Sequence, residues 1–205
     1  MSEPSSGLPR SEDLAPRLPL RPPKWVASDP RGAGLAEALA AHTAPLSDLS
    51  TARALTGGWT PDVAAALEAA RDAGHLERGL EAAERKLIAE ERGLTLTDQT
   101  ASTPRRPRLS RLLVLTNDGA PRFYRNVATL LDRYGSRLAA IRLDVESAQL
   151  GALLFGEGSQ ARLVMLEHKL AVGAFLLALA PQYGAATPAA EAPPTNVDSE
   201  PLGPI

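Results

Sequence analysis

The sequence contains no cysteine and few aromatic residues. Without cysteine, this 205-residue chain cannot form a disulfide framework, a cysteine-ligated zinc ribbon or a thiol nucleophile. Aromatic residues make up 4% of the chain and hydrophobic residues 44%, so a core can form but must consist mainly of leucine, alanine and valine. The lack of cysteine also fits a reducing compartment, and we expect a cytoplasmic protein.

Long apolar runs are absent as well. A membrane-spanning helix needs roughly 18–20 consecutive apolar residues, but the most apolar segment, residues 163–180, is interrupted by Glu167, His168 and Lys169. The N-terminus is repeatedly broken by proline and has no apolar run of signal-peptide length. The sequence therefore predicts no membrane partner.

The motifs that mark common enzyme and cofactor sites are also missing. The histidines His42, His75 and His168 lack a metal-binding spacing, and there is no glycine-rich nucleotide loop or Gly-x-Ser-x-Gly elbow. Asp118 and Asp144 each follow an expected strand, where paired carboxylates could act as acid and base, although helix capping is the commoner role. We therefore expect no catalytic residue, no metal site and no cofactor.

Composition divides the chain into a central globular part and two tails. Residues 1–30 and 184–205 are rich in proline and bury too little apolar surface to offset the entropy of ordering, which predicts disorder. Residues 31–58 predict short helices, whereas residues 62–183 predict one α/β domain. Inside that domain, prolines and several Ser and Thr residues predict a loop over residues 95–107.

Apolar periodicity predicts alternating helices and strands in this domain. Thr60 and Pro61 have the sequence of a helix start, and Gly74 and Gly93 that of helix ends. Strands that alternate with helices favour βαβ units, and therefore a mainly parallel sheet with helices on both faces. The expected helices cover residues 34–42, 47–55, 62–73, 79–92, 121–134, 146–154 and 169–179, and the expected strands cover residues 109–118, 137–143 and 161–166.

Charge is distributed unevenly, although the net charge is only −2. Residues 62–98 contain nine acidic and five basic side chains, whereas residues 101–145 contain nine arginines, three aspartates and no lysine. Arginine suits bidentate phosphate recognition better than lysine, so Arg105, Arg106 and Arg108, in or beside the expected loop, are candidates to follow an RNA backbone. The alternative interpretation is that arginine is simply the default cation of a sequence rich in alanine and leucine.

Several short strings, taken in order, resemble the kink-turn-binding ribosomal protein family, which includes the archaeal large-subunit protein seven-Ae and small bacterial relatives. In residues 67–84, LEAARDAGHLERGLEAAE, an Ala-Arg-x-Ala-Gly-x-Leu turn ends one helix and a Gly-x-Glu begins the next. A strand that ends in Asp118, a Leu-Gly pair at residues 150–151 and a third strand, ARLVMLEH, follow in the order of the family. The resemblance covers residues 62–183.

This resemblance implies a three-layer α/β/α sandwich around a small central sheet, and RNA binding without catalysis. The implied partner is structured RNA such as ribosomal RNA, in the ribosome or in translation, and no DNA is expected. Between the glycine and the glutamate the family usually carries a polar residue, where this chain has Leu80. Carried over residue by residue, the implied RNA-binding positions are Gly79, Leu80, Glu81, Glu167, His168 and Lys169.

A second and shorter resemblance lies upstream of this domain. Residues 25–39, WVASDPRGAGLAEAL, are similar to the Trp/Tyr-x-x-x-Asp-Pro part of a small bacterial nucleic-acid-binding domain, without its Arg-Cys-x-x-Cys signature. On this similarity, residues 31–58 are interpreted as a degenerate remnant of that domain.

Two other functions remain open for this chain. The first is a protein-interaction or regulatory module that keeps the fold and docks a protein partner through its leucine- and alanine-rich helix faces. The second, and the least expected, is a small enzyme that uses Asp118 and Asp144. Salt dependence separates RNA binding from apolar protein docking, because RNA binding weakens through counterion release as salt is added.

Overall fold

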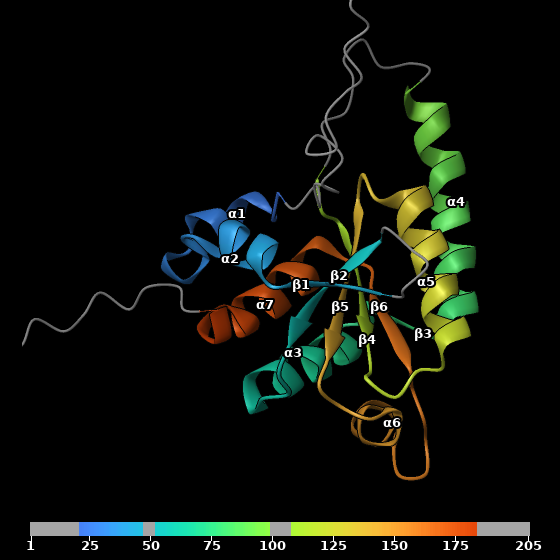
Figure 1. Ribbon diagram of the computed structural model, residues 1–205. Helices are drawn as coiled ribbons and strands as arrows, with labels where there is room; N and C mark the ends of the chain where they lie inside the picture. The colour runs from blue at the N-terminus through green and yellow to red at the C-terminus, as the bar shows by residue number, and fades with distance from the viewer. Residues whose placement is uncertain (1–20, 47–51, 99–107, 184–205) are drawn as a thin grey trace, which may run out of the picture.

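The computed structural model describes residues 21–46, 52–98 and 108–183 (Figure 1). It confirms an α/β fold, in which a mixed sheet lies between two layers of helices. The tail predicted over residues 184–205 lies outside the described residues, and so do residues 1–20 of the tail predicted at the N-terminus.

Within the described residues, the sheet consists of the strands β1 (Thr43–Pro45), β2 (Arg53–Gly57), β3 (Leu76–Arg78), β4 (Arg111–Leu115), β5 (Leu138–Leu143) and β6 (Leu163–Leu166). Their order across the sheet is β1-β2-β5-β4-β6-β3. The centre is parallel, because β5 pairs in parallel with both β2 and β4. The flanks are antiparallel, since β1 pairs with β2, β6 with β4 and β3 with β6 in that sense. The mainly parallel sheet expected from the sequence is therefore a mixed one.

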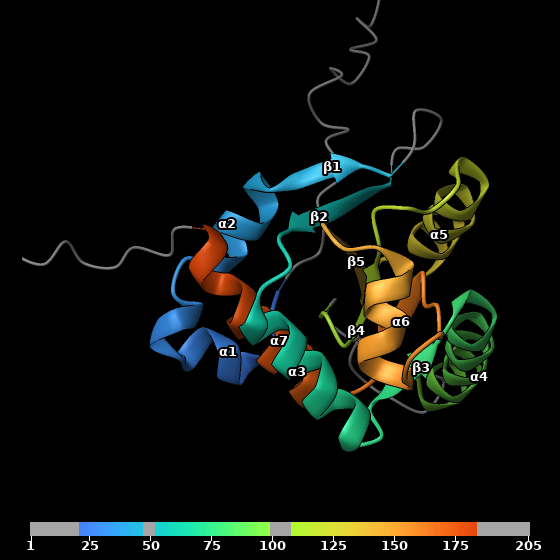
Figure 2. The same ribbon diagram turned by 90° about the horizontal axis from the view of Figure 1, so that it is seen from below.

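Helices cover both faces of this sheet, as Figure 1 and Figure 2 show. Each face has its own apolar core: Leu87 and Val127 belong to one, Leu67 and Phe175 to the other. This arrangement confirms the expected three-layer sandwich. One layer contains α4 (Leu80–Asp98) and α5 (Pro121–Tyr134), and the other contains α1 (Lys24–Ser28), η2 (Pro30–Gly32), α2 (Leu35–Ala41), α3 (Pro61–Asp72), α6 (Ser147–Phe155), α7 (Lys169–Leu179) and η3 (Ala180–Tyr183).

Several helix boundaries follow from local sequence chemistry. α3 begins at Pro61, and the Oγ1 of the N-cap Thr60 accepts a hydrogen bond from the Val63 N–H at 3.3 Å. Gly74 follows the helix with a φ of +68°, a left-handed conformation that glycine adopts without a steric penalty. α5 has the bounds that its apolar periodicity predicts, residues 121–134.

The N-terminal region contributes more to the fold than its sequence indicates. The helix expected over residues 47–55 is wrong where the structure describes it, because β2 begins at Arg53 and pairs in parallel with β5. Ala54 and Leu55 are buried in the cores of opposite faces. A short apolar run does not distinguish such a strand from a buried helix. Residues 31–58, expected to hold short helices, therefore also contain two strands of the sheet.

Part of the predicted N-terminal tail is also helical. α1 lies within residues 1–30, and its Val26 is completely buried. Trp25 packs on α7 at Gly173, where an added Cβ atom would lie 2.2 Å from the indole ring. A short segment between prolines has too few apolar residues to show helical periodicity, so this contact was not expected from the sequence.

α4 is longer than expected, since it continues through Gly93 to Asp98. A glycine inside a helix costs only about 1 kcal/mol relative to alanine, which neighbouring contacts can outweigh. One of these is the hydrogen bond that the Thr95 Oγ1 donates to the Glu91 carbonyl at 2.9 Å. The loop expected over residues 95–107 therefore begins later, and its remainder lies outside the described residues.

Candidate nucleic-acid interface

The two groups of residues implied to bind RNA lie at opposite ends of β6. The Gly79 N–H donates a hydrogen bond to the Leu163 carbonyl at 2.9 Å, at the start of the strand. The Glu167 N–H donates to the His75 carbonyl at 3.0 Å, just beyond its end. At about 3.3 Å per residue, these points are roughly 13 Å apart. The structure therefore does not bring the two groups together.

The first group lines a cavity of about 440 Å³ at the start of α4, which we call the Gly79 pocket. Gly79 has a φ of +88°, so a side chain at this position would be strained. Because Gly79 has no side chain, it offers no side-chain cap to the helix that follows. The pocket is lined by Arg78, Gly79, Leu80, Glu81, Ala82, Arg85, Phe123, Gln160, Arg162 and Leu163.

Positive charge dominates the Gly79 pocket. It contains the side chains of Arg78, Arg85 and Arg162, and Glu81 is the acidic residue that lines it. The N–H groups of the first turn of α4 have no acceptor within the helix, and the dipole of this 19-residue helix adds partial positive charge there. A phosphate group is the kind of ligand that such a helix start and its arginines favour.

The three arginines differ in how they are held. The Arg78 guanidinium donates to the Gln160 carbonyl at 2.8 Å and lies 4.4 Å from the centre of the Phe155 ring, which fixes its position. In the part of the chain that the structure describes, the guanidinium groups of Arg85 and Arg162 have no hydrogen-bond or ion-pair partner. Two of the three cations are therefore free to contact a ligand.

Sequence reasoning missed these three arginines. Arg78 lies in β3, a strand that the periodicity did not predict, and Arg162 directly precedes β6. They become neighbours only because β3 pairs with β6, with Arg78 opposite Val164. No local sequence signal could have found this pairing, since the two strands are more than 80 positions apart.

At the other end of β6, two of the three implied residues have structural partners. The Glu167 carboxylate forms an ion pair with Lys86 at 2.8 Å, which raises the pKa of that lysine. The His168 Nδ1 accepts a hydrogen bond from the Leu170 N–H at 3.3 Å and so caps α7. Lys169 is exposed. Glu167 and His168 therefore contribute to the fold at this end.

His168 also stacks on His75, with 4.3 Å between the ring centres. Burial and the neighbouring His75 lower the pKa of His168 below its usual value. A neutral ring is also what the cap of α7 requires, because a protonated Nδ1 cannot accept a hydrogen bond.

The loop arginines are not near the Gly79 pocket where they can be placed. Arg105 and Arg106 lie outside the described residues. Arg108 is exposed and precedes β4, whose first residues pair with the last residues of β6. Arg108 therefore lies at the end of the sheet where Glu167 and His168 are found.

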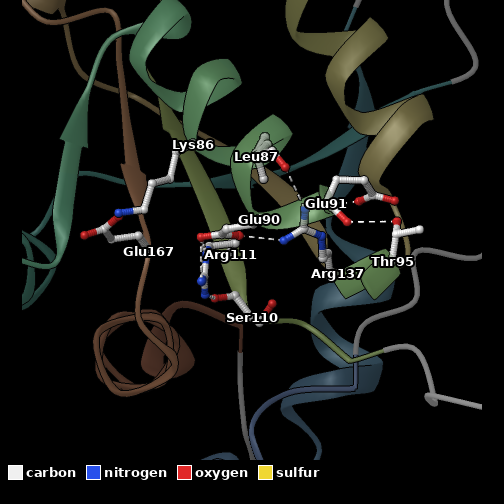
Figure 3. A network of polar contacts seen from close by, with 9 residues as sticks. All are labelled: Lys86, Leu87, Glu90, Glu91, Thr95, Ser110, Arg111, Arg137 and Glu167. Atoms are coloured by element: carbon white, nitrogen blue, oxygen red, sulfur yellow. Dashed lines mark hydrogen bonds and ion pairs between the residues drawn. The ribbon is translucent and has the colours of Figure 1, made fainter. Parts of the chain in front are cut away.

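Other arginines of the basic segment form internal ion pairs (Figure 3). The Glu90 carboxylate of α4 accepts hydrogen bonds from Arg111 at 2.7 and 3.0 Å and from Arg137 at 2.5 Å. Arg137 also donates to the Leu87 carbonyl at 3.1 Å and to Glu91 at 3.3 Å. The side chains of Glu90, Arg111 and Arg137 are only 18%, 20% and 11% exposed. We call these three residues the Glu90 network, and it joins α4 to the sheet.

Asp118 and Asp144 each accept hydrogen bonds from side chains beside them. Asp118 accepts hydrogen bonds from the Ser147 N–H at 3.1 Å and the Ser147 Oγ at 2.6 Å, and so caps α6. Burial raises the pKa of Asp118, but these bonds and one from Thr116 outweigh burial and keep the pKa below its usual value. Asp144 accepts a hydrogen bond from the Asn117 side chain at 2.7 Å. Both carboxylates therefore have structural partners.

Among residues 21–46, 52–98 and 108–183, no cluster of three or more His, Asp and Glu side chains could hold a metal ion. In the same residues, no helix combines the length and the apolar character needed to cross a membrane. Comparison of the chain with protein-family models, with curated proteins and with solved structures found no match.

Proposed function

We propose that this chain is a non-catalytic RNA-binding protein that holds an RNA phosphate backbone at the Gly79 pocket. The observation that carries the proposal is the position of Arg78, Arg85 and Arg162 around the start of α4, with Glu81 as the acid that lines the cavity. The resemblance to kink-turn-binding ribosomal proteins independently implies RNA contacts at Gly79 and Glu81. It also implies a role in the ribosome or in translation.

The chemistry of the pocket supports contact with the backbone more than with bases. Arginine forks and helix N–H groups match phosphate oxygens, which carry no sequence information. Leu80 stands where the family has a polar side chain and cannot hydrogen-bond a base edge. We therefore expect binding that depends on RNA shape and on salt.

Fluorescence anisotropy of the full chain with two labelled RNAs tests this proposal. One RNA contains a kink-turn, and the other is a regular duplex of equal length. The variant combines Arg78→Gln, Arg85→Gln and Arg162→Gln, and a matched control combines Arg92→Gln, Arg125→Gln and Arg133→Gln, which remove the same charge from exposed helix positions outside the pocket.

We expect the pocket variant to weaken RNA binding by about 30-fold or more, since each charge-assisted contact contributes roughly 1.5 kcal/mol or more. The slope of log affinity against log salt should become shallower by roughly two units, because up to three phosphate contacts are lost. The control should lose less than about threefold. Equal losses in the two variants, or no binding of the unmodified chain to either RNA at low salt, would refute the proposal.

A protein partner is the alternative, and two exposed apolar side chains favour it. Trp25 is 37% exposed and Leu170 is 52% exposed, and Trp25 packs on α7 one turn from Leu170. Docking through such side chains would depend little on salt. A partner whose affinity stays constant from low to physiological salt would therefore support the alternative.

A further inference from the structure

A second cavity, of about 650 Å³, lies at the carboxyl ends of β2 and β5. We call it the strand-end pocket, and its functional groups come from His42, Asn117, Arg142, Asp144, Gln182 and Tyr183. It shares no lining residue with the Gly79 pocket. Cavities of about 300–1,000 Å³ are the usual size for small-molecule ligands.

The strand-end pocket borders, through Asn117 and Asp144, a position that α/β sheets use for ligands. After β4 the chain passes to α5 on one face, and after β5 it passes to α6 on the other. Such a reversal separates the connections and opens a crevice beyond the carboxyl ends of the parallel strands. Asn117 follows β4 and Asp144 follows β5, so both lie at this crevice.

The end of the described chain forms one wall of the pocket. The Gln182 side chain accepts a hydrogen bond from the Gly58 N–H at 2.7 Å and donates one to the Gly58 carbonyl at 3.2 Å. The Tyr183 hydroxyl donates to the Thr56 carbonyl at 2.6 Å. Burial raises the pKa of Tyr183 to about 12, so the hydroxyl remains a donor. These bonds fix the wall before any ligand binds.

Gly57 allows this wall to approach β2 closely. A Cβ atom on Gly57 would lie 3.0 Å from the Leu179 side chain and 3.2 Å from the Tyr183 hydroxyl. Both distances are shorter than ordinary van der Waals contacts, so a side chain at this position would displace the wall. The His42 and Tyr183 rings also line the pocket; their centres lie 4.9 Å apart with the planes tilted by 38°, so each presents an aromatic face.

Two charged side chains of the pocket, Arg142 and Asp144, keep hydrogen-bonding capacity that could serve a ligand. Within the described residues, the half-buried Arg142 guanidinium has no hydrogen-bond or ion-pair partner. Asp144 accepts one hydrogen bond, from Asn117 at 2.7 Å, and its second carboxylate oxygen remains available. Arg142 and Asp144 are two positions apart and form no ion pair with each other. A cation and an acceptor side by side suit a ligand that carries an anion next to hydroxyl groups.

We infer that the strand-end pocket binds a ribonucleotide 5′-phosphate. Arg142 receives the phosphate, the free oxygen of Asp144 accepts hydrogen bonds from the ribose hydroxyls, and the base stacks on the aromatic wall of His42 and Tyr183. This chemistry is present in a free mononucleotide and in the phosphorylated 5′ end of an RNA. The inference does not depend on RNA binding at the Gly79 pocket.

Isothermal titration calorimetry of the full chain with three small ligands tests the assignment of groups. AMP carries the phosphate, the ribose hydroxyls and the base. Adenosine lacks the phosphate, and 2′,3′-dideoxyadenosine 5′-phosphate lacks the ribose hydroxyls. We expect adenosine to bind at least about tenfold more weakly than AMP, and the dideoxy compound about fivefold more weakly. Arg142→Gln should reduce the affinity for AMP to that for adenosine, whereas Arg125→Gln, an exposed cation outside the pocket, should not change it.

A short single-stranded RNA with either a 5′-phosphate or a 5′-hydroxyl distinguishes the two sources of the ligand. If AMP does not bind but the phosphorylated RNA binds about tenfold more tightly than its hydroxyl form, and Arg142→Gln removes that difference, the ligand is an RNA end. If neither AMP nor the 5′-phosphate changes binding, the inference is wrong. If circular dichroism shows that Arg142→Gln does not fold, the test is the comparison of AMP with adenosine on the unmodified chain. Equal affinities for the two compounds would then contradict the inference.

The same measurements keep this inference separate from the proposed RNA surface. The triple variant at Arg78, Arg85 and Arg162 should keep its full affinity for AMP, because none of these residues lines the strand-end pocket. A loss of AMP binding in that variant would contradict the assignment to Arg142.

Discussion

The middle and the start of α4 use arginine in opposite ways. At its middle, Arg111 and Arg137 surround Glu90 and are largely buried. At its start, Arg85 and Arg162 have no partner among the described residues and are exposed. The comparison shows that a count of charges along the chain does not identify a binding surface. What matters is which charges the fold pairs with each other.

The largest predicted effect is a loss of stability when the Glu90 carboxylate, which Arg111 and Arg137 share, is removed. Glu90→Ala leaves two partly buried guanidinium groups without a counter-charge, so we expect the free energy of unfolding to fall by about 2–3 kcal/mol. Glu91→Ala is the matched control, because Glu91 is 52% exposed and should contribute about 0.5 kcal/mol or less. Urea unfolding of both variants measures the difference. Equal stabilities would mean that the Glu90 network does not hold α4 to the sheet.

Reversing charge should distinguish the two ends of the sheet in RNA binding. Arg85→Glu combined with Arg162→Glu should lower RNA affinity by about 100-fold or more, because the variant replaces two phosphate contacts with repulsion. Reversing Arg105, Arg106 and Arg108 together should lower it less. Electrophoretic mobility shift at fixed salt measures both. A larger loss from the loop variant would place the main RNA contact at the other end of β6.

Gly79, directly before α4, and Gly93, inside it, should respond to alanine with opposite sign. Gly79→Ala places a side chain at a φ of +88° and should destabilise the protein by about 1 kcal/mol. Gly93 lies inside the helix, and an added Cβ there meets no atom within 4 Å, so Gly93→Ala should stabilise by about 0.5–1 kcal/mol. Thermal unfolding measures both, and a change of the same sign in the two variants would contradict the assigned backbone conformations.

The smallest effect should be a pH dependence at His168. The folded state lowers the pKa of this ring below about 6.5, so below that pH the unfolded chain binds the proton more readily. The contribution of His168 to the free energy of unfolding should therefore be fully present above about pH 6.5. It should be lost as the pH falls toward the lower pKa of the folded state. Urea unfolding at pH 7.5 and 5.5 should show a smaller loss for His168→Asn, which caps a helix without titrating. An equal loss would exclude His168 as the cause.

Local chemistry explains which parts of the fold could be predicted. The Thr60–Pro61 helix start and the apolar face of α5 depend on neighbouring residues, and both were correct. β2 was missed because its burial comes from helix layers far away in sequence. Similarly, Gly79 could be singled out from its sequence context, but Arg162 joins it only through the pairing of β3 with β6.

The charge pattern shows the same limit. The sequence shows the excess of arginine over residues 101–145, but it does not show which of these arginines form internal ion pairs and which remain available to a ligand. Arg111 and Arg137 serve the internal Glu90 network, and Arg142 faces the strand-end pocket. The partners of each arginine depend on which strands lie side by side, and strand order is a property of the whole chain.

The two outermost strands of the sheet, β1 and β3, are only three residues long, and β1 ends in Pro45. Short strands with proline expose few unpaired backbone groups and so discourage edge-to-edge association between molecules. The six-residue β5 is different, because nearly all of its side chains are buried. A chain that began at residue 62 would lack β1 and β2 and would leave β5 as a long apolar edge. The N-terminal strands therefore also protect the sheet against aggregation.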